Sequence, residues 1–95
     1  MKSIEFYKVK NKGIDYSIRG DMHCLTQLYK RDVSGDKVKF MVKNSMDKIG
    51  IQETKAVIAG SDKLLILRIN KTTFFIVTCL IDSMHVKRNT LKIYL

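Results

Sequence analysis

The sequence predicts an α+β fold in which two short helices pack on one face of an antiparallel β-sheet of about four to five strands. Three observations support this prediction. Polar and apolar residues alternate near both ends of the chain, apolar residues recur at helical spacing over residues 22–42, and turn-forming residues divide the second half into short segments. The chain of 95 residues is long enough for one core, so we expect residues 1–95 to form a single domain.

A pair of strands is predicted at the N-terminus. The segment SIEFYKVK, residues 3–10, alternates between polar and apolar residues, and Gly13 separates it from IDYSIRG, residues 14–20. Ile14, Tyr16 and Ile18 of the second segment share one face, as in a half-buried strand.

A first helix is predicted from residue 22 to about residue 31. Asp21 precedes it and suits the N-cap, where a carboxylate accepts hydrogen bonds from free backbone amides. A helical wheel divides the helix into two sides. The apolar side carries Met22, Leu25, Leu28 and Tyr29, with Cys24 at its edge, and the polar side carries His23, Gln27, Lys30 and Arg31. We expect the apolar side, Tyr29 included, to pack.

A second helix is predicted to begin after Ser34 and to end near Asn44. Ser34 has the character of an N-cap, and Asp36 in the first turn complements the helix dipole. Apolar residues at helical spacing then follow at Val38, Met41 and Val42.

The second half of the chain changes to strand-like periodicity. Its segments are IGIQ near residue 50, KAVIAG from residue 55, KLLILRIN from residue 63, TTFFIVTCLI from residue 72, and TLKIYL at the C-terminus. Turn-forming residues at 60–62 and 70–71 lie between them, which indicates an antiparallel meander.

Charge limits the kind of partner that the protein can have. Lys and Arg number 18 against 9 Asp and Glu, giving a formal net charge of +9. This excess attracts nucleic acid or an acidic protein without any specific motif. The apolar window at residues 72–81 is shorter than the roughly 18 to 20 residues that span a bilayer. No secretory segment is visible, so we expect a cytoplasmic protein without a membrane partner.

Local signatures of most enzyme classes are missing from the sequence. It contains no P-loop, dinucleotide-binding glycine motif, zinc-protease motif, nucleophile elbow or EF-hand. Cys24, Cys79, His23 and His85 also lack zinc-site spacing, so we expect reduced thiols, no metal and no cofactor.

The polar side of the first helix is the main candidate for chemistry. His23 is followed one turn later by Gln27 and two turns later by Lys30 and Arg31. Cleavage of a phosphodiester without metal uses a base for the 2′-hydroxyl and cations for the extra charge on phosphorus. His titrates near neutral pH and Arg binds phosphate bidentately. The alternative is a solvated basic face, which is what most such stripes are.

Other candidate residues lie in the second half of the chain. Thr78 is a hydroxyl in an apolar strand, and it either fills the strand or faces a cleft. Arg68 is either an edge charge or a phosphate ligand. Tyr94 offers a ring for stacking on a base, and Lys87, Arg88 and Asn89 form a basic turn suited to an RNA backbone.

The segment from His23 to Val38 resembles small toxin-like ribonucleases of the RelE/HigB and barnase/EndoU/colicin-type fold group, including relatives whose core begins with a His helix. The resemblance uses His23, Arg31, Val33, Ser34, Asp36 and Val38, and continues through Gly60–Lys63, LLILRIN, Lys71–Thr73 and Ile76–Thr78. It covers about residues 14 to 80. The chain departs from the pattern at Gln27, where relatives often have Arg, and at Asn44, where they have Gly.

The resemblance implies an endoribonuclease of toxin type that cleaves RNA by transesterification without metal. His23 would be the general acid or base, Arg31 would hold the scissile phosphate, and Thr78 would hydrogen-bond that phosphate or orient a catalytic group. Arg68, Lys30, Gln27 and Tyr94 are further candidates for substrate binding. Such toxins pair with an acidic antitoxin or immunity protein. The alternatives are a non-catalytic RNA- or DNA-binding regulator, and a protein-interaction domain that docks an acidic partner.

Overall fold

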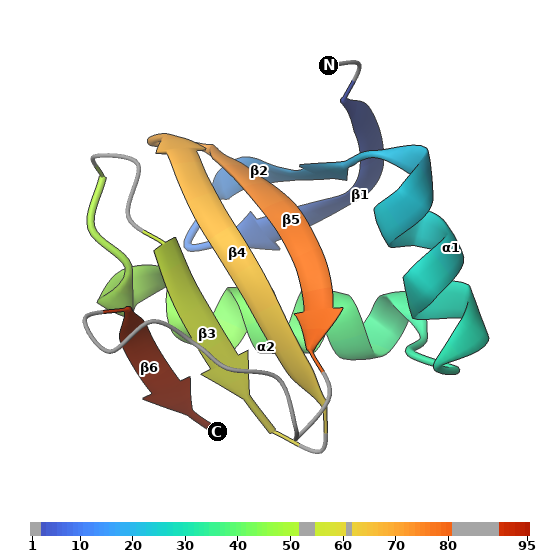
Figure 1. The fold of residues 1–95 in the computed structure, drawn as a ribbon. Helices are drawn as coiled ribbons and strands as arrows, with labels where there is room; N and C mark the ends of the chain where they lie inside the picture. The colour runs from blue at the N-terminus through green and yellow to red at the C-terminus, as the bar shows by residue number, and fades with distance from the viewer. Residues whose placement is uncertain (1–2, 52–54, 61, 81–89) are drawn as a thin grey trace.

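The computed structural model describes residues 3–51, 55–60, 62–80 and 90–95 (Figure 1). Their elements, in chain order, are β1 (Ile4–Asn11), β2 (Ile14–Gly20), α1 (Met22–Lys30), α2 (Gly35–Ser45), the 3₁₀ helix η1 (Met46–Lys48), β3 (Lys55–Ala59), β4 (Lys63–Asn70), β5 (Thr73–Leu80) and β6 (Leu91–Tyr94). The predicted basic turn at residues 87–89 and His85 lie outside the described residues.

The strands form one six-stranded sheet in the order β1-β2-β5-β4-β3-β6. The class is α+β, but the prediction of an antiparallel sheet of four to five strands is wrong. The sheet is mixed, because β2 pairs in parallel with the start of β5, with Ile18 opposite Phe74, and β6 pairs in parallel with β3. Both parallel pairs join strands that are distant in sequence, and the alternation within one strand does not specify such a partner.

The segment near residue 50 is not the strand that its sequence predicted. The 3₁₀ helix η1 continues α2 to Lys48, and Ile49 is buried in the core directly after it. A turn that is anchored by one buried apolar residue can have the same local sequence pattern as a short strand. Gln52 at the end of the predicted segment, and Ile81 at the end of the strand predicted from residue 72, lie outside the described residues.

Side-chain caps start both α-helices at the positions expected from the sequence. The Asp21 carboxylate accepts from the Cys24 amide at 2.7 Å, and the Ser34 hydroxyl accepts from the Lys37 amide at 3.2 Å. Between the helices, Asp32 has a left-handed backbone with φ 56°, which ends α1 and turns the chain into α2.

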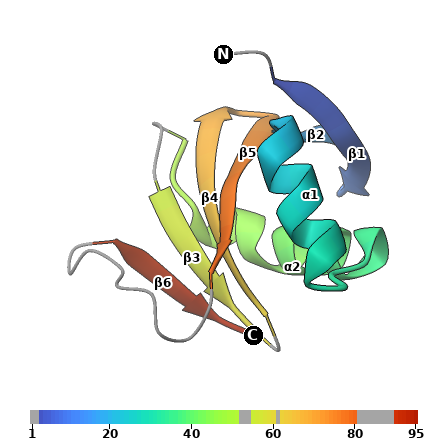
Figure 2. The ribbon, with the colours of Figure 1, turned by 45° about the vertical axis from the view of Figure 1, so that its right-hand side comes forward.

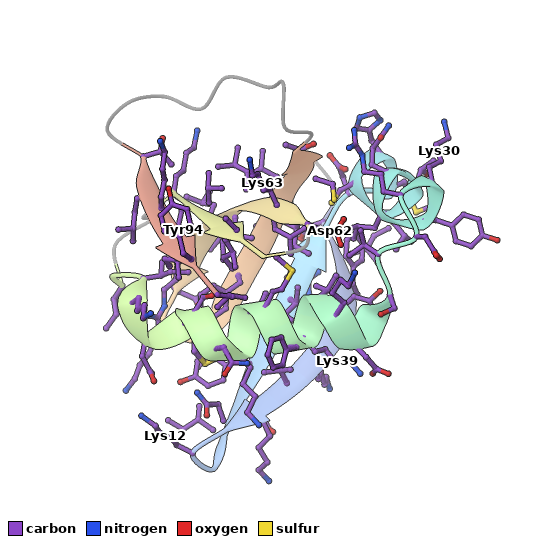
Figure 3. All side chains as sticks on the ribbon, turned by 90° about the horizontal axis from the view of Figure 1, so that it is seen from below. Lys12, Lys30, Lys39, Asp62, Lys63 and Tyr94 are labelled. Atoms are coloured by element: carbon purple, nitrogen blue, oxygen red, sulfur yellow. The ribbon has the colours of Figure 1, made fainter. Side chains whose placement is uncertain are left out.

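The helices and the sheet form two layers. Figure 1 shows α2 crossing behind β3, β4 and β5, and Figures 1 and 2 both show α1 alongside β5, which it contacts. Strand β2 pairs only with the first residues of β5, so the second half of β5 has α1 beside it. In Figure 3, α2 lies on one side of the sheet, and Lys63 and Tyr94 lie on the other.

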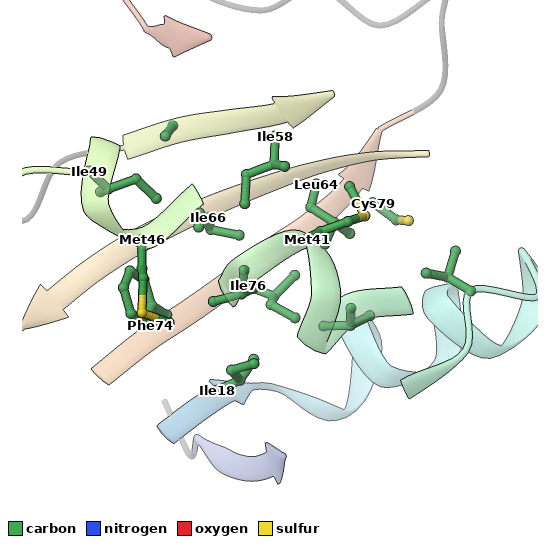
Figure 4. Packing of buried hydrophobic residues seen from close by; sticks show 14 of the residues in the cluster. Ile18, Met41, Met46, Ile49, Ile58, Leu64, Ile66, Phe74, Ile76 and Cys79 are labelled. Atoms are coloured by element: carbon green, nitrogen blue, oxygen red, sulfur yellow. The ribbon is translucent and has the colours of Figure 1, made fainter. Parts of the chain in front are cut away.

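One hydrophobic cluster fills the space between the two layers (Figure 4). The helices contribute Cys24, Leu28, Val38, Met41 and Val42 to it. The sheet contributes alternate residues of its strands, among them Ile18, Ile58, Leu64, Ile66, Phe74 and Ile76. The side chains between these alternate positions therefore project from the opposite face of the sheet.

Candidate nucleic-acid interface

Helix α1 has two chemically different flanks on either side of its buried residues Cys24 and Leu28. The apolar flank carries Leu25 and Tyr29, which line a cleft together with Tyr7 of β1. His23, Gln27 and Lys30 lie on the other flank by helical periodicity. Because the apolar flank faces β1 and the start of α2, the His23 flank faces the side of the sheet that lies away from α2.

The predicted catalytic residues His23 and Thr78 lie toward the same side of the molecule. In the antiparallel register Thr78 is opposite Leu65, whose neighbours Leu64 and Ile66 are both buried beneath the helices. Thr78 therefore projects from the face away from α2, where it is half-buried and its hydroxyl donates to the Cys79 carbonyl at 3.4 Å. His23 is exposed and makes no hydrogen bond or ion pair with the part of the chain that the structure describes.

Arg31 is the C-cap residue of α1 and is only partly exposed. Its Nε is buried and has no hydrogen-bond partner among the described residues. It also lies near Cys79. Burial raises the pKa of the Cys79 thiol, and the positive charge of Arg31 opposes this rise. A buried donor without a partner carries an unrecovered desolvation cost, and Nε of Arg68 shares this property among the described residues.

Arg68 lies on the helix side of the sheet, away from the other candidates. Arg68 is 8 % exposed, and its guanidinium donates to the carbonyls of Met46, Ile49 and Lys71 at 3.2, 2.6 and 2.8 Å. These bonds hold the end of η1 and the β4–β5 turn, so Arg68 is a structural residue in this fold. Its alternation with the buried Leu64 and Ile66 was the sequence feature that could have indicated this position.

The face of the sheet away from α2, which we call the open face, carries cations around an apolar centre in which Val57 is only 3 % exposed. Residues that lie opposite one another on neighbouring strands form two rows across this face. One row is Arg19, Phe75, Leu67 and Lys55, and the next is Thr78, Leu65, Val57 and Lys92. A third, shorter row contains Lys63, Ala59 and Tyr94. Tyr94 is 73 % exposed on the edge strand β6, opposite Ala59 of β3.

The charge of the open face is positive. Its described cations are Lys8, Lys10, Arg19, Lys55, Lys63 and Lys92, and its described carboxylates are Glu5 and Asp15. Arg19 donates to Ser3, and Glu5 accepts from Ser17, so these two charges already have local partners. Lys55 and Lys92 are exposed on neighbouring strands. The sequence prediction missed Lys55, Lys92 and Phe75, because their common face depends on the strand order.

The described residues offer no alternative site based on metal. Nowhere in residues 3–51, 55–60, 62–80 and 90–95 do three His, Cys, Asp or Glu side chains gather closely enough to hold an ion. Within the same ranges, neither α-helix has the length and apolar character to cross a bilayer.

These features define the chain as an α+β protein with helices on one side of a mixed sheet and a basic, aromatic face on the other. Comparison of the chain with protein-family models, with curated proteins and with solved structures gives no match. The resemblance to toxin ribonucleases therefore stays a prediction.

Proposed function

We propose that this protein binds single-stranded RNA on the open face of its sheet. The observation that carries the proposal is the register that surrounds Phe75 and neighbouring apolar side chains with Arg19, Lys55 and Lys92. Unpaired bases stack on aromatic rings, and lysines along the same groove contact the phosphates. Tyr94 at the edge of this face supplies a second, more exposed ring.

A metal-independent endoribonuclease is the second candidate function. The observation that favours it is the common orientation of the His23 flank of α1 and Thr78 of β5, with the unpaired Nε of Arg31 near the end of β5. In this reaction His23 takes the proton of a 2′-hydroxyl, the 2′-oxygen attacks phosphorus, and the P–O5′ bond breaks. The 5′-oxygen leaves as a hydroxyl by taking a proton from water, and the 2′,3′-cyclic phosphate remains. Arg31 binds the phosphate, Thr78 orients it, and Gln27 and Lys30 contact the flanking RNA.

The ribonuclease function would also require a protein partner. A cytoplasmic ribonuclease toxin requires neutralisation, and the net charge of +9 favours an acidic antitoxin or immunity protein as the neutralising partner.

One experiment tests the proposal and separates the candidates. Purified protein is titrated into fluorescein-labelled, unstructured RNA in EDTA, and the same samples are run on a denaturing gel. We expect salt-dependent binding that Tyr94→Ala weakens by about 5- to 100-fold, since stacking of one base contributes about 1–3 kcal/mol. Tyr29→Ala is the matched control, because Tyr29 lies on the other flank of α1, and it should leave binding unchanged.

The outcomes distinguish three functions. Cleavage that is lost in His23→Ala while binding persists supports the ribonuclease. Binding without cleavage supports a non-catalytic RNA-binding protein. Absence of RNA binding at physiological salt overturns the proposal and favours a domain that docks an acidic protein.

A further inference from the structure

A cleft of about 740 Å³ lies on the apolar flank of α1, away from the open face. Its lining residues are Tyr7, Leu25, Thr26, Leu28, Tyr29, Asp32, Val33, Ser34 and Gly35. Leu28 and Val33 are buried at its floor, whereas Leu25 is half-buried. The volume and the apolar floor are sufficient for one large side chain of a binding partner.

Exposed apolar side chains lie beside this cleft. Tyr29, which the sequence predicted to pack, is 86 % exposed, and Met22 on the same flank of α1 is 59 % exposed. Tyr and Met are enriched in protein interfaces, where their burial supplies much of the binding energy. A large apolar side chain that remains exposed next to an apolar cleft is typical of an interaction surface.

The rigidity of the cleft wall comes from close packing between β1 and α2. A Cβ atom added to Gly35 would lie 2.7 Å from Cε1 of Tyr7, so the Tyr7 ring rests directly on the α2 backbone. The Lys39 ammonium lies 5.5 Å from the centre of the same ring. Tyr7 is therefore held in place before any partner binds, which lowers the entropic cost of association.

Charge indicates the chemistry of the partner. Lys39 of α2 contacts Tyr7 at the cleft wall. Asp32 is a local carboxylate in the lining, but the whole chain carries +9. At this net charge, long-range attraction favours an acidic partner and opposes a second copy of the chain.

We propose that this cleft binds an acidic protein segment, which inserts one large apolar side chain between Tyr7 and Tyr29. The site is separate from the open face, because the two surfaces lie on opposite flanks of α1. The protein can therefore bind such a partner without using Tyr94, Lys55 or Lys92.

The test uses synthetic peptides, each with one central tryptophan flanked by Asp and Glu. The protein contains no Trp, so tryptophan fluorescence reports the peptide alone. We expect a saturable blue shift with the acidic peptide and at least about 5-fold weaker binding when Trp is replaced by Ala, measured by competition. Tyr29→Ala should weaken binding by a similar factor, and Tyr94→Ala, the matched control, should change it less than twofold.

Each other outcome overturns the proposal. Equal binding of a lysine-flanked peptide excludes an acidic partner, and equal loss in the two Tyr variants excludes this cleft. Absence of saturable binding to the acidic peptides excludes the proposed occupant. A concentration-dependent dimer that Tyr29→Ala abolishes assigns the surface to a second copy of the chain. RNA binding is measured on the same samples, so failure of this site is distinguishable from failure of the open face.

Discussion

The guanidinium of Arg68 lies 5.1 Å from the centre of the Phe74 ring, inside the layer between the helices and the sheet. Phe74 is fully buried, and both side chains project from the same face of neighbouring strands. The cation is fixed on the ring because three backbone carbonyls accept from its terminal nitrogens. Arg68 thus links β4, the end of η1 and the β4–β5 turn to the core.

Replacement of Arg68 by Leu should destabilise the protein by about 3 kcal/mol, because buried carbonyls lose charged hydrogen-bond donors. The measurement is urea unfolding followed by circular dichroism. Arg19→Leu is the matched control, since within the described residues Arg19 bonds only with the exposed Ser3, and it should change stability by less than about 0.5 kcal/mol. Equal effects of the two substitutions would contradict the structural role of Arg68.

Local features of the fold were predictable from the sequence, and features that depend on distant pairing were not. Asp21 and Ser34 begin their helices because a cap acts on amides within three residues of itself. The parallel pairing of Ile18 with Phe74 joins segments that are far apart in the chain, and no periodicity within either segment specifies it. The mixed strand order follows from such pairings.

The candidate site shows the same limit. The helical wheel placed His23 and Tyr29 on different sides of α1, but it could not say which arc of the helix the sheet covers. The sheet covers Cys24 and Leu28, so Tyr29 is left exposed. The alternation of Arg68 with Leu64 and Ile66 could have indicated its inward position, but its carbonyl partners at Met46, Ile49 and Lys71 depend on the folded arrangement.

Loss of the α1 cap should have a measurable effect, because α1 has only nine residues and contributes few of the core side chains. Asp21→Ala removes the acceptor of the 2.7 Å bond from the Cys24 amide and should cost about 1 kcal/mol. Thermal unfolding gives the magnitude, and faster hydrogen exchange of the Cys24 amide locates the change. Asp15→Ala, an exposed carboxylate on β2, should alter neither; an identical response would refute the capping role.

The Cys24 thiol should resist modification while the protein is folded. Burial, followed by the nearby Asp21 and Cys79, raises the pKa of Cys24 to about 12, so the reactive thiolate is scarce near neutral pH. An unfolded cysteine has a pKa of about 8.5. Between these two pKa values the folded protein keeps the Cys24 proton and the unfolded chain loses it. The contribution of the Cys24 thiol to the free energy of unfolding is therefore complete below about pH 8.5 and is lost as the pH rises toward 12.

Two measurements check the Cys24 prediction. Thiol labelling at pH 8 should proceed only at the rate of unfolding, and added urea should accelerate it. The free energy of unfolding, measured from pH 8 to pH 11, should fall less steeply in Cys24→Ala than in the wild type. Comparison of the two proteins cancels the contribution of the lysines and tyrosines that both contain. Fast labelling of Cys24 in the native protein would show that the thiol is accessible and the α1–β5 packing is different.

Binding of RNA to the open face should depend on salt through individual lysines. Each phosphate neutralised on a single strand contributes about −0.7 to the slope of log K against log salt. Lys55→Gln and Lys92→Gln should therefore each reduce the slope by about 0.7, and the double variant by about 1.4, because these exposed side chains lie on neighbouring strands of one face. Lys43→Gln is the control of equal charge change: Lys43 is exposed on α2, on the other side of the sheet, and its loss should leave the slope unchanged. Equal slopes for all three single variants would mean that RNA is held by the diffuse positive field of the protein and not by the open face.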